Sequence, residues 1–332
     1  MRAVMIAGAL SLLAVAAAVV AVAPGEPPCT AKPRATIDTA GGAEDLVTLA
    51  LADGRVRLFF RDAGQISYAD LRTADDAAPA AALAWRPRDG DFDPLGISLV
   101  DGPAGSATLY VTDRVTPARI WRLPIVDGRI GEVTEPWARS LGDVRPNDIQ
   151  AVGDDVYVTH LDAAAKLPGR PVPWHGVVRV RAAGTLEPYA EGLRGANGII
   201  DLDEKRLLVS DYWSKRLRYV SKDPGGAPPA FATRELPIHP DNLTRDGSRV
   251  LIAGQRSYVL AFFNVLMPFV PSPSAVLSID VAQLKNDADP VPLWEGGVFD
   301  GRSVSVAVPV PGGLALGQVR AKGVLVVRCA AP

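Results

Sequence analysis

The sequence holds few of the residues and motifs from which most enzymes build a reactive centre. Its 332 residues include only two cysteines and three histidines. It contains no Gly-x-Ser-x-Gly elbow, no phosphate-binding loop, no His-Glu-x-x-His and no Cys-x-x-Cys. The common motifs of serine hydrolases, nucleotide-binding loops, zinc proteases and dithiol enzymes are thereby excluded. The net charge is −2 and no run of basic residues occurs, which argues against nucleic acid as a partner.

Long apolar runs are also scarce, and the longest one stands at the N-terminus. Residues Ala3–Ala23 carry no charge, and as a helix they would span about 31 Å, close to the thickness of a bilayer core. We predict that residues 1–23 are an export signal, either cleaved or kept as a membrane anchor, with residues 24–34 as a linker. A buried core helix is the weaker alternative, because the segment is apolar on nearly all faces. The remaining chain would lie on the periplasmic or extracellular side.

What the sequence does contain is a repeat of about 50 residues, in which a short motif precedes a β-like run. No apolar period of 3.6 residues persists beyond the N-terminal segment, so strands are expected to dominate. The repeated motifs are Glu44-Asp45-Leu46, Leu95-Gly96-Ile97, Asn147-Asp148-Ile149, Asn197-Gly198-Ile199, Asp241-Asn242-Leu243 and, more weakly, Arg302-Ser303-Val304. An all-β repeat of this length predicts a propeller, and roughly 300 residues suit six blades. We therefore predict an all-β, six-bladed β-propeller over residues 35–332.

The motifs would bring oxygen atoms together, because each propeller blade sends its innermost strand along the central axis. Carboxylates and amides that converge there are the ligands of a hard cation such as calcium. Taken alone, each motif is more common as a turn or a solvated edge, and only the shared spacing favours a metal site. Neighbouring residues of a strand point to opposite sides, so a pair such as Glu44-Asp45 can serve two sites.

The two cysteines stand near opposite ends of the chain that follows the apolar segment. Cys29 comes shortly after that segment, and Cys329 lies three residues before Pro332. Export permits a disulfide, and a closed propeller brings its two ends together in one blade. We favour a disulfide between Cys29 and Cys329 over the alternative of two separate buried thiols.

Two further segments depart from the repeat. Residues Tyr258–Val270 are apolar apart from Asn264 and Pro268, which predicts a buried strand that runs into a loop. The alternative is an apolar lip beside the mouth of a site, or a surface that dips into a membrane. Residues Ala74–Arg88 are rich in Ala, Asp and Pro, and we expect them to form a loop between blades.

The motifs, in this order and spacing, resemble those of the paraoxonase/arylesterase family of calcium-dependent six-bladed propellers. That family is related to gluconolactonases and to strictosidine-synthase-like proteins. The resemblance runs from Cys29 to Cys329. The segments that carry it are Gly42-Ala43-Glu44-Asp45-Leu46, Pro146–Gly153, Ala196-Asn197-Gly198-Ile199 and Asp241-Asn242-Leu243. It implies a disulfide that closes the propeller and a hydrophobic N-terminus that stays uncleaved.

The resemblance also implies two calcium ions, one catalytic and one structural. The ligands of the catalytic calcium would be Glu44, Asn147, Asn197, Asp241 and Asn242. A second, buried calcium would be held by Asp45, Asp148 and the backbone carbonyl of Ile97. The first set offers five oxygen ligands, and one or two waters would complete the roughly 6–8 that calcium prefers.

The sequence departs from the family at the two histidines that are thought to activate water. Leu95 and Arg114 stand at those positions, and neither is a base at neutral pH. The candidate catalytic residues are therefore Asp241, which could act while calcium polarises a carbonyl, and His239, two residues before it.

We expect a calcium-dependent hydrolase of small-molecule esters or lactones. The first alternative is a calcium-stabilised propeller that binds a ligand or partner without turnover, which the loss of both histidines favours. The second is a strictosidine-synthase-like enzyme that forms carbon–nitrogen bonds.

Overall fold

The computed structural model describes residues 27–75, 81–102, 106–142, 144–160, 176–181, 185–223, 230–267, 270, 272–286, 288–296 and 303–330. The predicted signal or anchor at residues 1–23 lies outside these ranges, as does the start of the linker at residues 24–34. Within the ranges, no helix is both long enough and apolar enough to cross a membrane.

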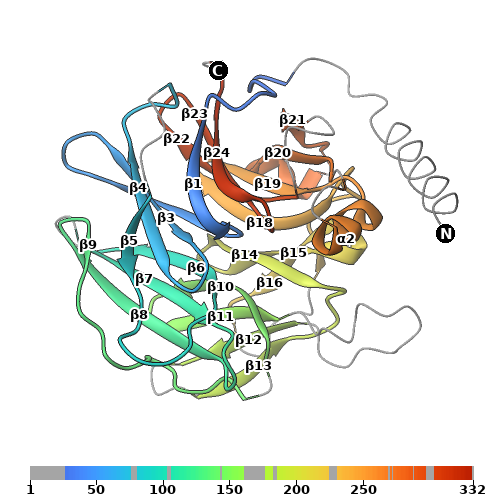
Figure 1. Ribbon diagram of the computed structural model, residues 1–332. Helices are drawn as coiled ribbons and strands as arrows, with labels where there is room; N and C mark the ends of the chain where they lie inside the picture. Colours follow the sequence, from blue (N-terminus) through green and yellow to red (C-terminus); the bar gives the residue numbers. More distant parts are fainter. Residues whose placement is uncertain are drawn as a thin grey trace, which may run out of the picture.

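The described strands form six antiparallel sheets of four strands each, arranged as blades around a central axis (Figure 1). Blade 1 consists of β2 (Leu46–Ala50), β3 (Val56–Arg61), β4 (Ile66–Leu71) and β5 (Ala82–Trp85). Blade 2 consists of β6 (Pro94–Asp101), β7 (Ser106–Asp113), β8 (Arg119–Val126) and β9 (Arg129–Ile130). Blade 3 consists of β10 (Pro146–Val152), β11 (Asp155–His160), β12 (Gly176–Val180) and β13 (Leu186–Ala190). Blade 4 consists of β14 (Ala196–Asp203), β15 (Arg206–Asp211), β16 (Arg216–Ser221) and β17 (Ala230–Phe231). Blade 5 consists of β18 (His239–Asp246), β19 (Arg249–Gln255), β20 (Ser274–Asp280) and β21 (Val291–Glu295). Blade 6 consists of β22 (Val304–Val310), β23 (Gly313–Gln318), β24 (Lys322–Arg328) and β1 (Ala35–Gly42). The predicted six-bladed β-propeller is confirmed.

The described residues of the repeated motifs lie at the inner edges of the blades. Each innermost strand contacts the innermost strands of the two neighbouring blades; these strands are β2, β6, β10, β14, β18 and β22. Their approach leaves no room for side chains at two positions. An added Cβ would lie 2.7 Å from the Asn147 carbonyl oxygen at Gly96, and 2.6 Å from the Asp241 carbonyl oxygen at Gly198. Packing around the axis therefore requires glycine in these motifs.

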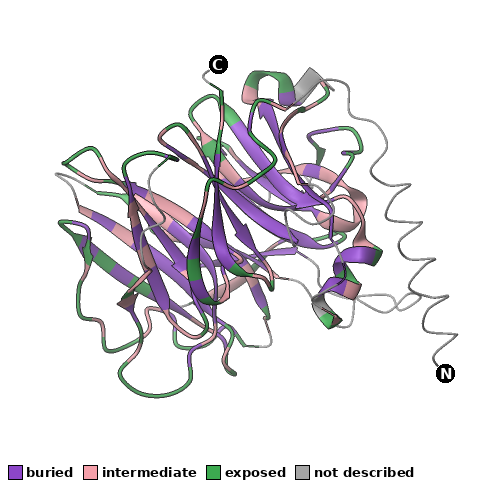
Figure 2. Cartoon of the chain, turned by 45° about the horizontal axis from the view of Figure 1, so that its top comes forward, coloured by how far each residue is buried: buried purple, intermediate pink, exposed green. Residues whose placement is uncertain are grey.

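Apolar side chains fill the space between neighbouring blades. Phe60 of blade 1 belongs to the same buried cluster as Val306 of blade 6, and Ile120 of blade 2 to the same buried cluster as Ile149 of blade 3. Figure 2 shows the resulting pattern, in which the strands are largely buried and the connecting loops are largely exposed. The core thus forms a ring around the axis, and it holds the inner strand ends in fixed positions.

The two ends of the chain meet in blade 6. β1 pairs with β24 as the outermost strand of that blade, and Cys29 forms a disulfide with Cys329 across 300 residues. Closing a loop of this length restricts the unfolded chain by about 6 kcal/mol in the chain-entropy model, which is an upper value. The predicted disulfide is confirmed, and such a bond is typical of a protein exported to an oxidising compartment.

Two predictions about local structure were wrong. Residues Tyr258–Leu266 form helix α2 instead of a buried strand, and the Ser257 hydroxyl caps it by accepting from Leu260 N at 3.4 Å. Both faces of this helix are apolar, since Val259, Phe262 and Leu266 are exposed while Leu260 and Ala261 are buried. The sequence therefore lacked the helical spacing of apolar and polar residues from which an amphipathic helix is usually predicted.

The second error concerns the expected loop at Ala74–Arg88, which contains the short edge strand β5. Its four residues pair with β4, as at Ile66 and Trp85. The described short 3-10 helices are η3 (Tyr212–Ser214) and η4 (Val281–Asn286).

Candidate functional site

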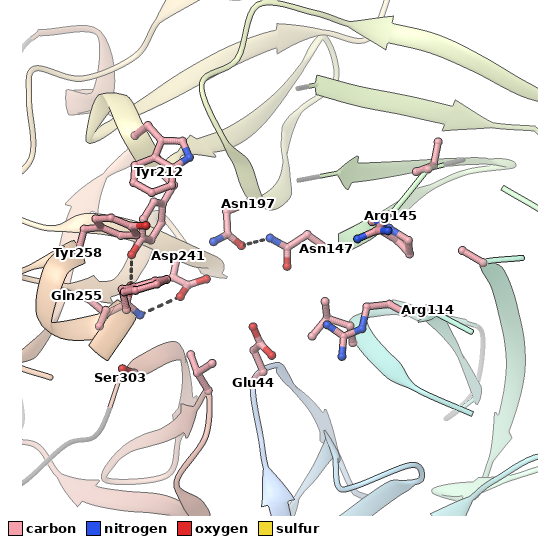
Figure 3. Close-up of a pocket in the computed structure, with 18 of the residues that line it drawn as sticks. Glu44, Arg114, Arg145, Asn147, Asn197, Tyr212, Asp241, Gln255, Tyr258 and Ser303 are labelled. Carbon is pink, nitrogen blue, oxygen red and sulfur yellow. Dashed lines mark hydrogen bonds between the residues drawn. The ribbon is translucent and has the colours of Figure 1, made fainter. Parts of the chain in front are cut away.

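A pocket of about 810 Å³ lies where the innermost strands begin. Its walls differ in chemistry (Figure 3). One side is aromatic, with Tyr212, Trp213, Tyr258 and Phe262 among its lining residues. The other side carries the cationic side chains of Arg114 and Arg145. Between the walls lie the carboxylates and amides of the repeated motifs: Glu44, Asn147, Asn197 and Asp241.

Four of the five residues predicted to bind the catalytic calcium therefore line one pocket. They come from the inner ends of blades 1, 3, 4 and 5, and the two extremes, Glu44 and Asp241, are 197 residues apart in the sequence. Asn147 Nδ2 donates to Asn197 Oδ1 at 2.8 Å, so the two amides lie side by side. The propeller fold thus brings together polar groups that are far apart in the sequence.

The fifth predicted ligand, Asn242, lies just behind the pocket floor and is buried. Its Nδ2 donates to the Glu44 carbonyl oxygen at 3.0 Å, and its Oδ1 is buried with no hydrogen-bond partner. A buried acceptor without a partner is costly, and a cation would satisfy it. This atom is the clearest indication that the donor set fits a metal ion.

The two carboxylates of the set are only partly compensated. Arg61 Nη1 lies 3.3 Å from Glu44 Oε2, and Gln255 Nε2 donates to Asp241 Oδ2 at 2.9 Å. Burial, and then repulsion from Glu44, raises the pKa of the Asp241 carboxyl to about 8. A divalent cation between these groups would remove that repulsion, because it would neutralise both charges.

A second acidic cluster is sealed beneath the first. Asp45 accepts from Leu46 N at 2.9 Å and from Ile97 N at 2.6 Å. Asp148 repeats this pattern, accepting from Ile149 N at 2.7 Å and from Ile199 N at 2.8 Å. The contact that the structure shows for Ile97 is through its N–H, whereas its carbonyl was the predicted ligand.

The two buried carboxyls act on each other. Burial and repulsion from Asp148 raise the pKa of Asp45, and burial raises the pKa of Asp148 to about 7. Two buried acids in contact are stable only if they keep a proton or gain a cation. The chemistry of this pair therefore suits a second, buried ion.

Carboxylates alone do not make either cluster a familiar metal site. Among the described residues, no three or more His, Cys, Asp or Glu side chains lie together as a metal-binding group. At the pocket floor only Glu44 and Asp241 are acidic, and amides supply the remaining donors. Such a mixed set suits calcium, which accepts neutral oxygen ligands, better than it suits zinc.

The positions where the family would have histidines do face the pocket. Leu95 and Arg114 both line it, and Arg114 Nε donates to Asp93 Oδ2 at 3.0 Å. His239 is half-buried behind Tyr212, whose carbonyl oxygen lies 3.1 Å from His239 Nδ1, and His239 is not among the lining residues. Burial lowers the pKa of His239. The geometry thus places Asp241, and not His239, at the pocket.

Several lining residues escaped the sequence analysis, notably Tyr212, Gln255 and Arg145. Tyr212 and Gln255 stand at the ends of second strands, as Arg114 does, so the second-strand ends of blades 2, 4 and 5 carried the missing signal. Arg145 lies two residues before Asn147 and could have been found from the motif itself. Half of the aromatic wall, Tyr258 and Phe262, comes from α2, whose helical form the sequence did not indicate. The lip alternative for this segment agrees with its place in the pocket lining.

Comparison with known proteins defines the fold. No protein-family model and no curated protein matches the sequence. Among solved structures, a gluconolactonase from Xanthomonas campestris shares 15% identity over 93% of this chain and 96% of its own, with a TM-score of 0.56. A luciferin-regenerating enzyme shares 14% over 91% and 98%, with a TM-score of 0.56. A PQQ-bound aldose sugar dehydrogenase from Streptomyces coelicolor shares 15% over 93% and 100%, with a TM-score of 0.58.

The protein is therefore a six-bladed β-propeller whose structural neighbours include gluconolactonase-like proteins. At these identities the likeness establishes the fold, and the activity has to be argued from the site.

Proposed function

We propose that this protein is an exported, calcium-dependent hydrolase of small-molecule esters or lactones. The observation that carries the proposal is the convergence of Glu44, Asn147, Asn197 and Asp241 at one pocket, with the unpaired Asn242 Oδ1 behind them. The gluconolactonase-like neighbours agree with a lactonase on the same fold. The disulfide agrees with export, and membrane attachment through residues 3–23 is part of the proposal.

Glu44, Asn147, Asn197, Asp241 and Asn242 would hold the catalytic calcium, and Asp45, Asp148 and Ile97 a structural one. When bound, calcium would polarise a substrate carbonyl and stabilise the negative charge that develops on its oxygen. Arg61 holds one oxygen of Glu44, at Oε2, and so fixes that side chain at the pocket floor.

Asp241 is the residue that would move the proton. Its Oδ2 accepts from Gln255, so Oδ1 is the atom that would take a proton from the attacking water. The water oxygen bonds to the carbonyl carbon, the bond to the leaving oxygen breaks, and the proton passes to that oxygen. Burial by the aromatic wall would exclude bulk water and hold the apolar part of the substrate.

A second candidate function rests on a different observation. Leu95 is apolar and Arg114 is engaged by Asp93, so neither position offers a base to the pocket. A propeller that keeps calcium for stability and binds a small ligand without turnover would need no base.

Hydrolysis of a panel of aryl esters and lactones, with and without chelator, separates the two functions. We expect calcium-dependent turnover in the wild type and a large loss in Asn197→Ala. Gln150→Ala is the matched control, because Gln150 lies on β10 outside the pocket lining and donates to Ala151 O. Calcium binding without turnover of any panel member would reject the hydrolase in favour of the binding protein.

A further inference from the structure

Gln255 is the most enclosed amide of the pocket lining, with a relative exposure of 2%. It ends β19, and all of its polar groups are engaged. Its Nε2 donates to Asp241 Oδ2 at 2.9 Å and to the Val304 carbonyl oxygen at 3.1 Å. Its Oε1 accepts from the Tyr212 hydroxyl at 3.0 Å. Figure 3 shows this chain of contacts running from the aromatic wall to the carboxylate.

The chemistry of the partners fixes the orientation of this amide. The Val304 carbonyl oxygen can only accept, so it must face the NH2 group, and Asp241 Oδ2 accepts from the same group. The carbonyl end then points to Tyr212. Burial raises the pKa of Tyr212, so its hydroxyl keeps its proton and remains a donor at neutral pH. Each hydrogen bond in this chain therefore has a fixed donor and acceptor: Tyr212 donates to Gln255, and Gln255 donates to Asp241.

Tyr212 is itself held in place. It begins η3, and its ring packs against Trp213, His239 and Tyr258 at centroid distances of 5.2, 5.1 and 6.5 Å. Aromatic contacts on several sides restrict the rotation of the ring. The hydroxyl that orients Gln255 is thus anchored in blade 4, whereas Gln255 and Asp241 belong to blade 5.

Other blades show that the fold does not need glutamine here. In blades 2, 4 and 5, the residue just before the inner motif pairs with a residue of the second strand. Arg114, Tyr212 and Gln255 each follow that partner directly, so they occupy equivalent positions. Those partner pairs are Pro94 with Asp113, Ala196 with Asp211, and Pro240 with Gly254. An arginine and a tyrosine close the same strand junction in blades 2 and 4. The propeller fold thus accepts other residues at this position, so the hydrogen bond from Gln255 to Asp241 belongs to the site and not to the fold.

We propose that Gln255, anchored by Tyr212, is a positioning residue that fixes the Asp241 carboxylate for the cation at the pocket floor. The inference rests on the proposed calcium site. By holding Oδ2, Gln255 fixes the rotation of the Asp241 carboxylate at the pocket floor. Residues that hold metal ligands in this way commonly account for about 10- to 100-fold in affinity.

Calcium titration of the whole protein by calorimetry, after removal of bound metal, tests the assignment. Gln255→Met keeps the length of the side chain and removes its hydrogen bonds, and we expect a dissociation constant raised about 10- to 100-fold. Tyr212→Phe removes only the hydroxyl and should raise it less, by about threefold, since Gln255 keeps its two donor contacts.

Gln318→Met is the matched control. Gln318 is a buried glutamine at the end of β23 that donates to Gly323 O at 2.9 Å and does not line the pocket. Without metal, both Met variants should show a similar decrease in melting temperature, but only Gln255→Met should bind calcium more weakly. Equal affinity in Gln255→Met and the wild type would overturn the positioning role while leaving the proposed function intact. No calcium binding by the wild type would overturn both.

Discussion

The propeller axis carries two acidic clusters that differ in how their carboxylates are held. At the sealed cluster, Asp45 and Asp148 each accept from two backbone N–H groups. At the open pocket, Asp241 and Glu44 are held by the side chains of Gln255 and Arg61. Backbone donors come with the fold, whereas side-chain donors can be exchanged without changing it. We therefore expect the sealed cluster to contribute to stability and the open one to the proposed chemistry.

The largest expected effect comes from breaking the sealed cluster. Asp148→Ala leaves the N–H groups of Ile149 and Ile199 buried without acceptors, and we expect unfolding to become easier by about 2–5 kcal/mol. Urea denaturation at saturating calcium would measure this decrease in the free energy of unfolding.

The control for this change is Asp155→Ala on the next strand. Asp155 lies 3.5 Å from Arg179 in a partly exposed ion pair, so its removal should cost under about 1 kcal/mol. Equal decreases in the two variants would show that the sealed pair has no special structural role.

The stability of the protein should also depend on pH through the sealed cluster. Burial raises the pKa of Asp148 from 3.8 to about 7, so between these values the folded protein binds more protons than the unfolded chain. Without calcium, the free energy of unfolding should therefore fall as pH rises from about 4 to about 7, by on the order of 4 kcal/mol.

Calcium should remove this dependence, because the ion stabilises the charged pair that the empty site disfavours. Denaturation curves across this range, in calcium-free buffer and at saturating calcium, provide the measurement. A calcium-free protein whose stability rises with pH would contradict the raised pKa values and the buried site built on them.

The spacing of the repeated motifs predicted that Glu44, Asn147, Asn197 and Asp241 would meet at the axis, since a propeller maps equal spacing onto equal height. The division of the motifs' oxygen atoms into two calcium sites came from the family resemblance and stays a prediction. The walls could not be placed in this way. Tyr258 and Phe262 belong to a helix without a polar face. Tyr212 and Gln255 stand at equivalent strand ends outside the inner motifs, where the residue type differs from blade to blade.

The smallest expected effect concerns the aromatic wall of the open pocket. Phe262 lines the pocket, yet 41% of it is exposed, so Phe262→Ser should barely change the melting temperature. We expect KM for an aryl ester to rise about three- to tenfold with kcat nearly unchanged, because the substitution removes an apolar surface that is remote from the reacting atoms. Val259→Ser, on the same helix but outside the lining, should leave both constants unchanged. A fall in kcat for Phe262→Ser would mean that α2 acts on the carboxylates and amides themselves, and that the open site depends on its wall as the sealed one depends on its backbone.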